Sequence, residues 1–218
     1  KIFGNNEFIF YSLICLIFIV LVSIVLYFSS GFSSGKAILD AAFHVISIIT
    51  TTGFYTQDYN LWGSIIIMIF FVLMFTGGMA GSTSGGIKIV RLLLITKNSR
   101  QELRRLIHPN AFIPVRLDRR IIPQSAIYNL LVFIIIYFLL VSISSFIISF
   151  MGYDMITSFS TSASILGNIG PGIGTFGPFT NYSAMPMAGK WFLSGLMLLG
   201  RLELLMVMTL FTRNFYKH

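Results

Sequence analysis

Residues 37–54 read AILDAAFHVISIITTTGF, a short apolar stretch that ends in three threonines and a glycine. The apolar part, residues 37–49, has about 13 residues, whereas a helix needs about 20 to cross a hydrocarbon core of roughly 30 Å. Irregular backbone at membrane depth survives only where it contacts protein or lines a water-filled cavity. The pattern therefore predicts a half-helix that enters a membrane and returns to the same side through a glycine-bearing loop.

Two longer apolar stretches flank this short one. Residues 8–28 are long enough for one span, but residues 61–96 would measure about 54 Å as a single helix, which is too long for one crossing. Five glycines between positions 77 and 86 interrupt the second stretch, and each costs roughly 1 kcal/mol against alanine in a helix. We expect the helix to break there; the alternative is close helix packing through small residues.

The same order of segments occurs a second time. Residues 127–150 form an apolar span, residues 153–166 form a short stretch followed by a glycine loop, and residues 188–211 form a last span. Gly170 follows Gly53 by 117 residues, so the two glycine loops occupy matching positions. The repeat predicts an all-α membrane protein of two tandem, parallel units, each with a helix, a re-entrant pore helix and a second helix.

Composition and charge agree with this class. Hydrophobic residues make up 56% of the chain and charged residues only 10%, against about 25% in soluble domains. Nine of the fifteen Lys and Arg residues lie between Lys88 and Arg120, which predicts a cytoplasmic side for that region and for the C-terminus. We place the first unit at residues 1–97, a basic cytoplasmic linker at 98–122 and the second unit at 123–218. The net charge of +8 is not spread over a soluble face, so we expect no nucleic-acid partner.

The residues that could support catalysis do not form a recognisable site. His44, His108 and His218 are far apart in the chain, and the seven acidic residues show no metal-ligand spacing. The glycine pattern at 172–177 lacks the preceding strand that a dinucleotide-binding loop requires. We therefore expect neither an enzyme nor a bound cofactor.

The paired glycine loops are instead typical of an ion pathway. Backbone carbonyls can replace the water around an ion, and glycine adopts the unusual backbone angles that aim them at an axis. Two loops in matching positions favour this interpretation over ordinary turns that cap short helices. The candidate filter residues are Thr51, Thr52, Gly53 and Phe54 in the first loop, and Asn168, Ile169, Gly170 and Pro171 in the second.

Several strings make the chain similar to the Trk/Ktr family of potassium transporters. They are TTTGF at 50–54, GGMAGSTSGGIK at 77–88, IHP at 107–109, GNIGPG at 167–172 and LGRLE at 199–203. In that family four such units, all in one polypeptide, surround one pore with a simplified filter built around one glycine per unit. The resemblance implies potassium as the substrate, held by the backbone carbonyls of Thr51, Thr52, Asn168 and Ile169.

The resemblance also implies a gate below the filter. In the family a broken helix of the third unit forms an intramembrane loop, and an arginine of the last helix guards the pore at the same level. By position the gate residues are Gly77, Gly78, Gly81, Ser82, Thr83, Ser84, Gly85, Gly86 and Arg201. An arginine inside a span is a functional candidate, although Arg201 could instead form a packing ion pair with Glu203.

The same resemblance sets expectations for partners and location. It implies that two further units precede Lys1 in a longer chain, or else that two copies of this half assemble around one pore. It also implies a homodimer, a cytoplasmic nucleotide-binding regulatory ring and a bacterial inner membrane. Passive, sodium-coupled and proton-coupled (symport) transport stay open. The competing interpretations are a secondary transporter with a mid-membrane site at the broken helix, and a membrane scaffold without transport.

Overall fold

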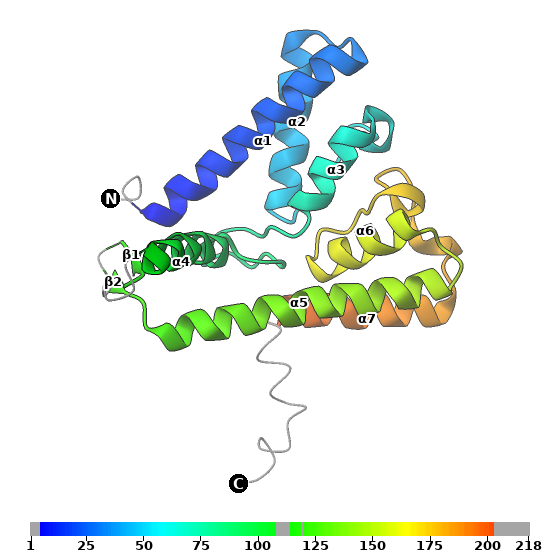
Figure 1. Ribbon diagram of the computed structural model, residues 1–218. Coiled ribbons are helices and arrows are strands. Elements are labelled where there is room, and N and C mark those ends of the chain that lie inside the picture. Colours follow the sequence, from blue (N-terminus) through cyan, green and yellow to red (C-terminus); the bar gives the residue numbers. More distant parts are fainter. Residues whose placement is uncertain (1–4, 108–113, 119, 203–218) are drawn as a thin grey trace.

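The computed structural model describes residues 5–107, 114–118 and 120–202 and is almost entirely helical (Figure 1). In chain order the elements are α1 (Asn6–Ser30), α2 (Ser34–Ile49), the 3-10 turn η2 (Tyr59–Trp62), α3 (Ser64–Leu73), α4 (Ile89–Ile107), β1 (Arg116–Leu117), β2 (Arg120–Ile121), α5 (Gln124–Phe150), α6 (Met155–Leu166), the turns η3 (Gly174–Phe176) and η4 (Tyr182–Ala184), and α7 (Met187–Arg201).

Two of the described helices, α1 and α5, are long and apolar enough to cross a membrane, over Asn6–Ser29 and Gln124–Phe150. Much of their apolar surface faces outward: Leu16 is 60% exposed and Ile135 is 64% exposed. Helices that are apolar on nearly every face need an apolar surrounding. The Asn5 side chain caps the start of α1 by accepting a hydrogen bond from the Glu7 backbone N–H at 2.8 Å.

The predicted repeat is present in the order and packing of the helices. In the first unit α2 packs on α1, and in the second α6 packs on α5. The short helix α6 is capped by Asp154, the residue before it, whose carboxylate accepts a hydrogen bond from the Thr157 backbone N–H at 3.2 Å. The two short helices end at Ile49 and Leu166, which are 117 residues apart, and both ends lie near the centre of the molecule in Figure 1.

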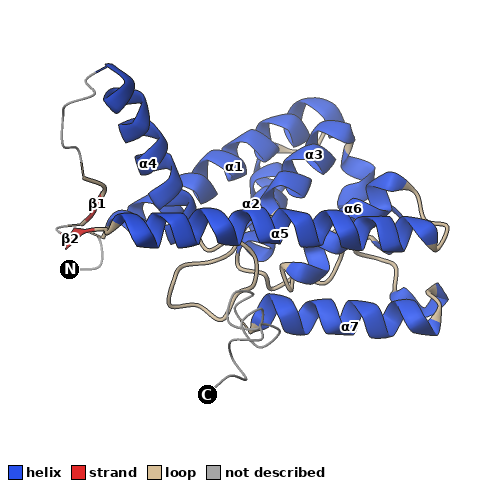
Figure 2. Cartoon of the chain, turned by 60° about the horizontal axis from the view of Figure 1, so that its bottom comes forward, coloured by secondary structure: helices blue, strands red, loops and turns tan. Residues whose placement is uncertain are grey.

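The long apolar stretch 61–96 is broken, as its glycines predicted. Helix α3 ends at Leu73, an irregular segment follows through Lys88, and α4 begins at Ile89. Figure 2 shows α4 projecting away from the other helices.

The first part of residues 98–122, which we expected to be a basic loop, is helical. Helix α4 continues through residue 97 to Ile107, because residues 98–107 contain good helix formers and an ion pair between Arg105 and Glu102 at 2.5 Å. Beyond it, β1 and β2 form a two-residue antiparallel ladder. The described part of the linker is therefore largely ordered.

The centre of the molecule is an apolar core with an unusual polar helix in it. Core side chains from both units include Phe70, Met74, Tyr137 and Leu166. Helix α6 is buried along most of its length although six of its twelve residues are serine or threonine. Such hydroxyls need partners when buried, and several of them bond to the loop that follows α6, as described next.

Candidate functional site

The loop after α2 reverses direction immediately at the helix end. Thr51 has φ 55° and Gly53 has φ 74°, and positive values are rare for a β-branched residue such as threonine. The backbone N–H groups of Thr52 and Gly53 both donate to the Ser47 carbonyl, at 2.9 and 3.3 Å. The Ser47 hydroxyl in turn donates to the Phe54 carbonyl at 2.7 Å. One buried serine therefore holds both ends of the loop.

The loop after α6 repeats the main features of this arrangement. Asn168 has φ 57° and Gly170 has φ 108°. The Ile169 N–H donates to the Ser164 carbonyl at 2.9 Å, and the Ser164 hydroxyl donates to the Pro171 carbonyl at 2.7 Å. Every one of these positions lies 117 residues after its counterpart in the first loop. Two segments with different side chains thus adopt the same backbone geometry.

Five carbonyl groups of these loops have no donor within the described part of the chain. The carbonyl oxygens of Thr51, Thr52, Gly53, Asn168 and Ile169 accept no hydrogen bond there. The other three loop carbonyls are paired: Phe54 accepts from Ser47, Pro171 accepts from Ser164, and Gly170 accepts from the Tyr182 hydroxyl at 2.8 Å. A backbone carbonyl without a protein donor needs another partner. These five are therefore available to a ligand that can take the place of a donor.

The two loops lie against each other. A side-chain Cβ added at Gly53 would collide with the carbonyl oxygen of Ile169 and would lie 3.1 Å from the Pro171 ring. Glycine is thus required at position 53 both by its positive φ and by the space left by the second loop. The Tyr59 hydroxyl adds a second link between the units, since it donates to the Gly172 carbonyl at 2.7 Å.

The segment between α3 and α4 is a closed loop and not a frayed helix. Thr76 and Ile87 form an isolated parallel bridge, and the Gly77 N–H donates to the Ile87 carbonyl at 2.9 Å. Inside the loop, the Gly78 N–H donates to the Ser84 hydroxyl at 2.8 Å, and Ser84 bonds Ser82 at 2.6 Å. The serines thus take over backbone hydrogen bonds that a continuous helix would make.

This loop is anchored from outside as well. The Ala80 N–H donates to a carboxylate oxygen of Glu7 in α1 at 2.6 Å, and the Lys88 ammonium lies 3.5 Å from the Ala80 carbonyl. The tip of the loop is therefore held by Glu7, which is 73 positions away in the chain, and by Lys88, which follows the loop.

The loop of residues 77–86, the loop after α6 and α7 meet at Asn168. A Cβ at Gly85 would collide with the Gly167 carbonyl and lie 3.1 Å from the Asn168 amide nitrogen, and a Cβ at Gly200 would lie 2.7 Å from the same nitrogen. That amide donates to the Met197 carbonyl of α7 at 3.2 Å. Glycines on two elements therefore permit close contact with Asn168.

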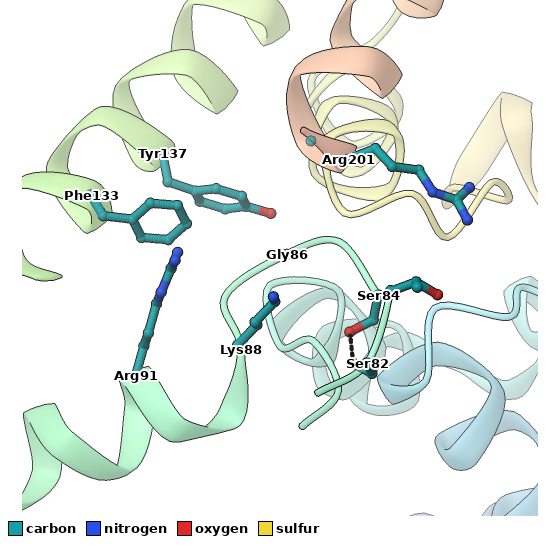
Figure 3. A pocket seen from close by; sticks show the side chains of 10 residues that line it. Ser82, Ser84, Gly86, Lys88, Arg91, Phe133, Tyr137 and Arg201 are labelled. Carbon is teal, nitrogen blue, oxygen red and sulfur yellow. Dashed lines mark hydrogen bonds between the residues drawn. The ribbon is translucent and has the colours of Figure 1, made fainter. Parts of the chain in front are cut away.

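A polar cavity of about 60 Å³ lies beside the loop, between α5 and α7 (Figure 3). Three cationic side chains line it, Lys88, Arg91 and Arg201, and Arg201 enters from the end of α7 across the loop from the other two. The Arg91 guanidinium lies 3.8 Å from the centre of the Phe133 ring, a cation–π contact. Glu203 lies outside the described residues.

A family model for the cation transport protein TrkH matches residues 8–216 of this chain. The chain belongs to the TrkH family. It is 35% identical over 206 residues to the Trk system potassium uptake protein TrkI of Halomonas elongata, covering 94% of this chain and 42% of that protein. It is 35% identical over 200 residues to TrkH of Escherichia coli K12, covering 91% and 41%.

A solved TrkH has the same fold. The crystal structure of the potassium transporter TrkH from Vibrio parahaemolyticus matches with a TM-score of 0.90 at 30% identity, over 99% of this chain and 46% of that one. The chain therefore spans somewhat less than half the length of the TrkH relatives it matches. Membership confirms the predicted family and the helical membrane-protein fold, and it places the chain in a family of cation transport proteins and not of enzymes.

The structure brings the residues that the sequence predicted as a filter together and adds others. The eight candidate filter residues form two adjacent loops, and the predicted gate segment lies directly against the second loop. Arg201 lies at the same cavity as Ser82, Thr83 and Ser84. The sequence reasoning did not identify Ser47, Ser164 or Glu7, although the 117-residue offset aligns the two serines and could have revealed them.

Proposed function

We propose that this chain supplies two of the filter loops of a potassium-conducting pore. The single observation that supports this most directly is the set of carbonyls without a protein donor, on Thr51, Thr52, Gly53, Asn168 and Ile169, in two adjacent loops of similar backbone geometry. A potassium ion takes carbonyl oxygens in place of its hydration water. Hydrogen bonds from the buried Ser47 and Ser164 hold both loops, through the carbonyls of Phe54 and Pro171.

Two loops supply only part of the oxygen shell of such an ion. The chain spans somewhat less than half of its relatives, so we infer that the remaining carbonyls come from further units of a longer polypeptide. A pair of identical halves is the second arrangement that would complete the ring. In either arrangement the pore axis passes beside Gly53 and Ile169.

The loop of residues 77–86 acts as the gate of this pathway in our proposal. It lies against Gly167 and Asn168, directly beside one filter loop, and its hydrogen bonds are local enough to break without unfolding a helix. Arg201 places a positive charge at the same cavity and would repel a cation there. Movement of the loop away from Asn168 would open the path.

The partners and the location that the resemblance to the Trk/Ktr family implies are compatible with this arrangement. The pore would lie in a bacterial inner membrane with residues 98–122 and the C-terminus on the cytoplasmic side. The projecting helix α4 and its last-turn Arg104 and Arg105 would offer a surface for a nucleotide-binding regulatory ring. The complete protein would assemble as a homodimer.

The test is cation flux through the complete protein in proteoliposomes, with rubidium, sodium and lithium compared. We expect rubidium flux to exceed sodium flux, and Gly53→Ser to reduce that preference, because a side chain at this position collides with the second loop. Gly35→Ala is the matched control, since its Cβ meets nothing within 4 Å and its φ is not positive. Flux that requires a coupling ion in fixed stoichiometry would indicate a secondary transporter, and no flux of any cation would indicate a scaffold.

A further inference from the structure

A second, much larger hollow lies away from the filter and the gate. It is an open groove of about 920 Å³ between α3 of the first unit and α5 and α6 of the second. Its interior is apolar, with Met68, Phe71, Phe75, Phe138, Val141 and Phe159 among the lining side chains. The volume is at the upper end of the roughly 300–1,000 Å³ that is usual for ligand pockets.

The groove opens to the outside of the helix bundle. Met68 on α3 is 69% exposed, and Phe138 is 45% exposed on α5, one of the two described helices long enough to cross a membrane. Apolar side chains that face outward along such helices suit hydrocarbon as the bordering medium. Helix α3 has ten residues and is about 15 Å long, which equals half of a hydrocarbon core of roughly 30 Å. The wall that α3 contributes to the groove thus has the length of one lipid leaflet.

One end of the groove is polar. Asn60, Ser64 and Gly174 line this end together with Asp154, and Asp154 is the one acidic residue in the lining. The hydrogen bond from Thr157 lowers the pKa of the Asp154 carboxyl, so that it is ionised at neutral pH. An apolar groove with an anionic mouth suits an amphiphile that has an apolar tail and a cationic group on its head.

We propose that this groove binds one acyl chain of an ammonium-bearing phospholipid of the phosphatidylethanolamine type, with the ammonium at Asp154. An anionic lipid such as phosphatidylglycerol has the same tail but would be repelled at the mouth. Two observations together identify this lipid as the occupant: the apolar wall is as long as one leaflet, and a single carboxylate lies at the polar end of the groove.

The bound chain would contact residues next to the proposed gate loop and next to the second filter loop. Phe75 lines the groove, and its carbonyl accepts the hydrogen bond from the Ile87 N–H that closes the base of the gate loop at 3.0 Å. Ile173 also lines the groove, and it is tied to α6 by hydrogen bonds with the Ser160 hydroxyl at 3.0 Å. This consequence rests on the proposed function, whereas lipid binding itself does not.

The experiment uses tryptophan fluorescence in the complete protein, reconstituted in equal amounts of phosphatidylethanolamine and phosphatidylglycerol. Phe138→Trp places a reporter in the groove, and Leu139→Trp, 52% exposed and next in the same helix, is the matched control outside it. Each is measured against the parent, which contains Trp62 and Trp191. Only one of the two lipids carries bromine on its chains in each sample.

We expect brominated phosphatidylethanolamine to quench Phe138→Trp about two- to fivefold more effectively than brominated phosphatidylglycerol, the range that an exposed ion pair supports. Leu139→Trp should show no preference, and Asp154→Asn should remove the preference at position 138. Equal quenching by both lipids at position 138 would overturn the proposal, as would an absence of quenching, which would indicate that a protein surface covers the groove. None of these readouts depends on potassium flux, so they stand apart from the test of the proposed pore.

Discussion

Removing the hydroxyl of Ser47 or Ser164 should weaken ion selection without removing the fold. Each hydroxyl donates to a carbonyl at the far end of its loop at 2.7 Å, to Phe54 in the first unit and to Pro171 in the second. A hydrogen bond of this kind contributes about 0.5–1.5 kcal/mol net, which corresponds to roughly a two- to tenfold change in the population of the held loop. We therefore expect Ser47→Ala and Ser164→Ala each to lower the rubidium-to-sodium flux ratio by that factor.

The assay is tracer flux into proteoliposomes that contain the complete protein, with the two variants measured singly and together. Ser194→Ala is the control, because Ser194 makes a bond of similar length, 2.9 Å to the Lys190 carbonyl, but within its own helix. If the loops act on one ion, the double variant should lose more selectivity than either single variant. Unchanged flux ratios in both single variants, with the control also unchanged, would refute the claim that these serines hold the ion-facing carbonyls.

Three other changes test neighbouring parts of the site. Gly53→Ala should lower rubidium flux more than Gly170→Ala, because a Cβ at 53 collides with the other loop whereas one at 170 meets nothing within 4 Å; equal losses would contradict the close approach of the loops. Asn168→Gly should keep the positive φ of the filter backbone but lose the hydrogen bond to α7, so basal flux should rise while ion selectivity is kept. Asn168→Ala should lose both the backbone geometry and the hydrogen bond, and therefore the selectivity as well, which ion-competition flux measures. Glu7→Ala should raise resting flux roughly two- to tenfold by freeing the Ala80 N–H, with Glu7→Gln intermediate, and an unaltered resting flux would mean that this anchor does not restrain the gate.

The sequence predicted the architecture well because membrane helices are constrained by length. Short apolar stretches that cannot span, glycines at fixed offsets and the break at residues 77–86 all follow from the thickness of the bilayer and from the cost of glycine in a helix. Contacts between distant residues did not follow. The bond between Glu7 and Ala80 joins residues 73 positions apart, and no local pattern marks either of them. Ser47 and Ser164 were also missed, since serine is common in these helices and only the loop geometry distinguishes these two.

The helical part of the linker was missed for a different reason. A high density of positive charge was taken as the mark of a loop, but the side chains of Arg100, Arg104 and Arg105 are compatible with a helix that reaches water. Charge indicates the side of the membrane and not the local structure. The groove between α3 and α5 could not be predicted at all, because it depends on how the two units are spaced.

The equal geometry of the two loops has a consequence for how such a protein can evolve after internal duplication. In the proposed pore the ligands are main-chain atoms, so TTGF in one copy and NIGP in the other would present corresponding oxygens to an ion while their side chains diverge. Asn168 keeps the left-handed backbone that Thr51 has and also carries an amide that donates a hydrogen bond to α7. In such a ring of similar binding groups, Asn168 would be a position at which movement of α7 could be transmitted to the ion.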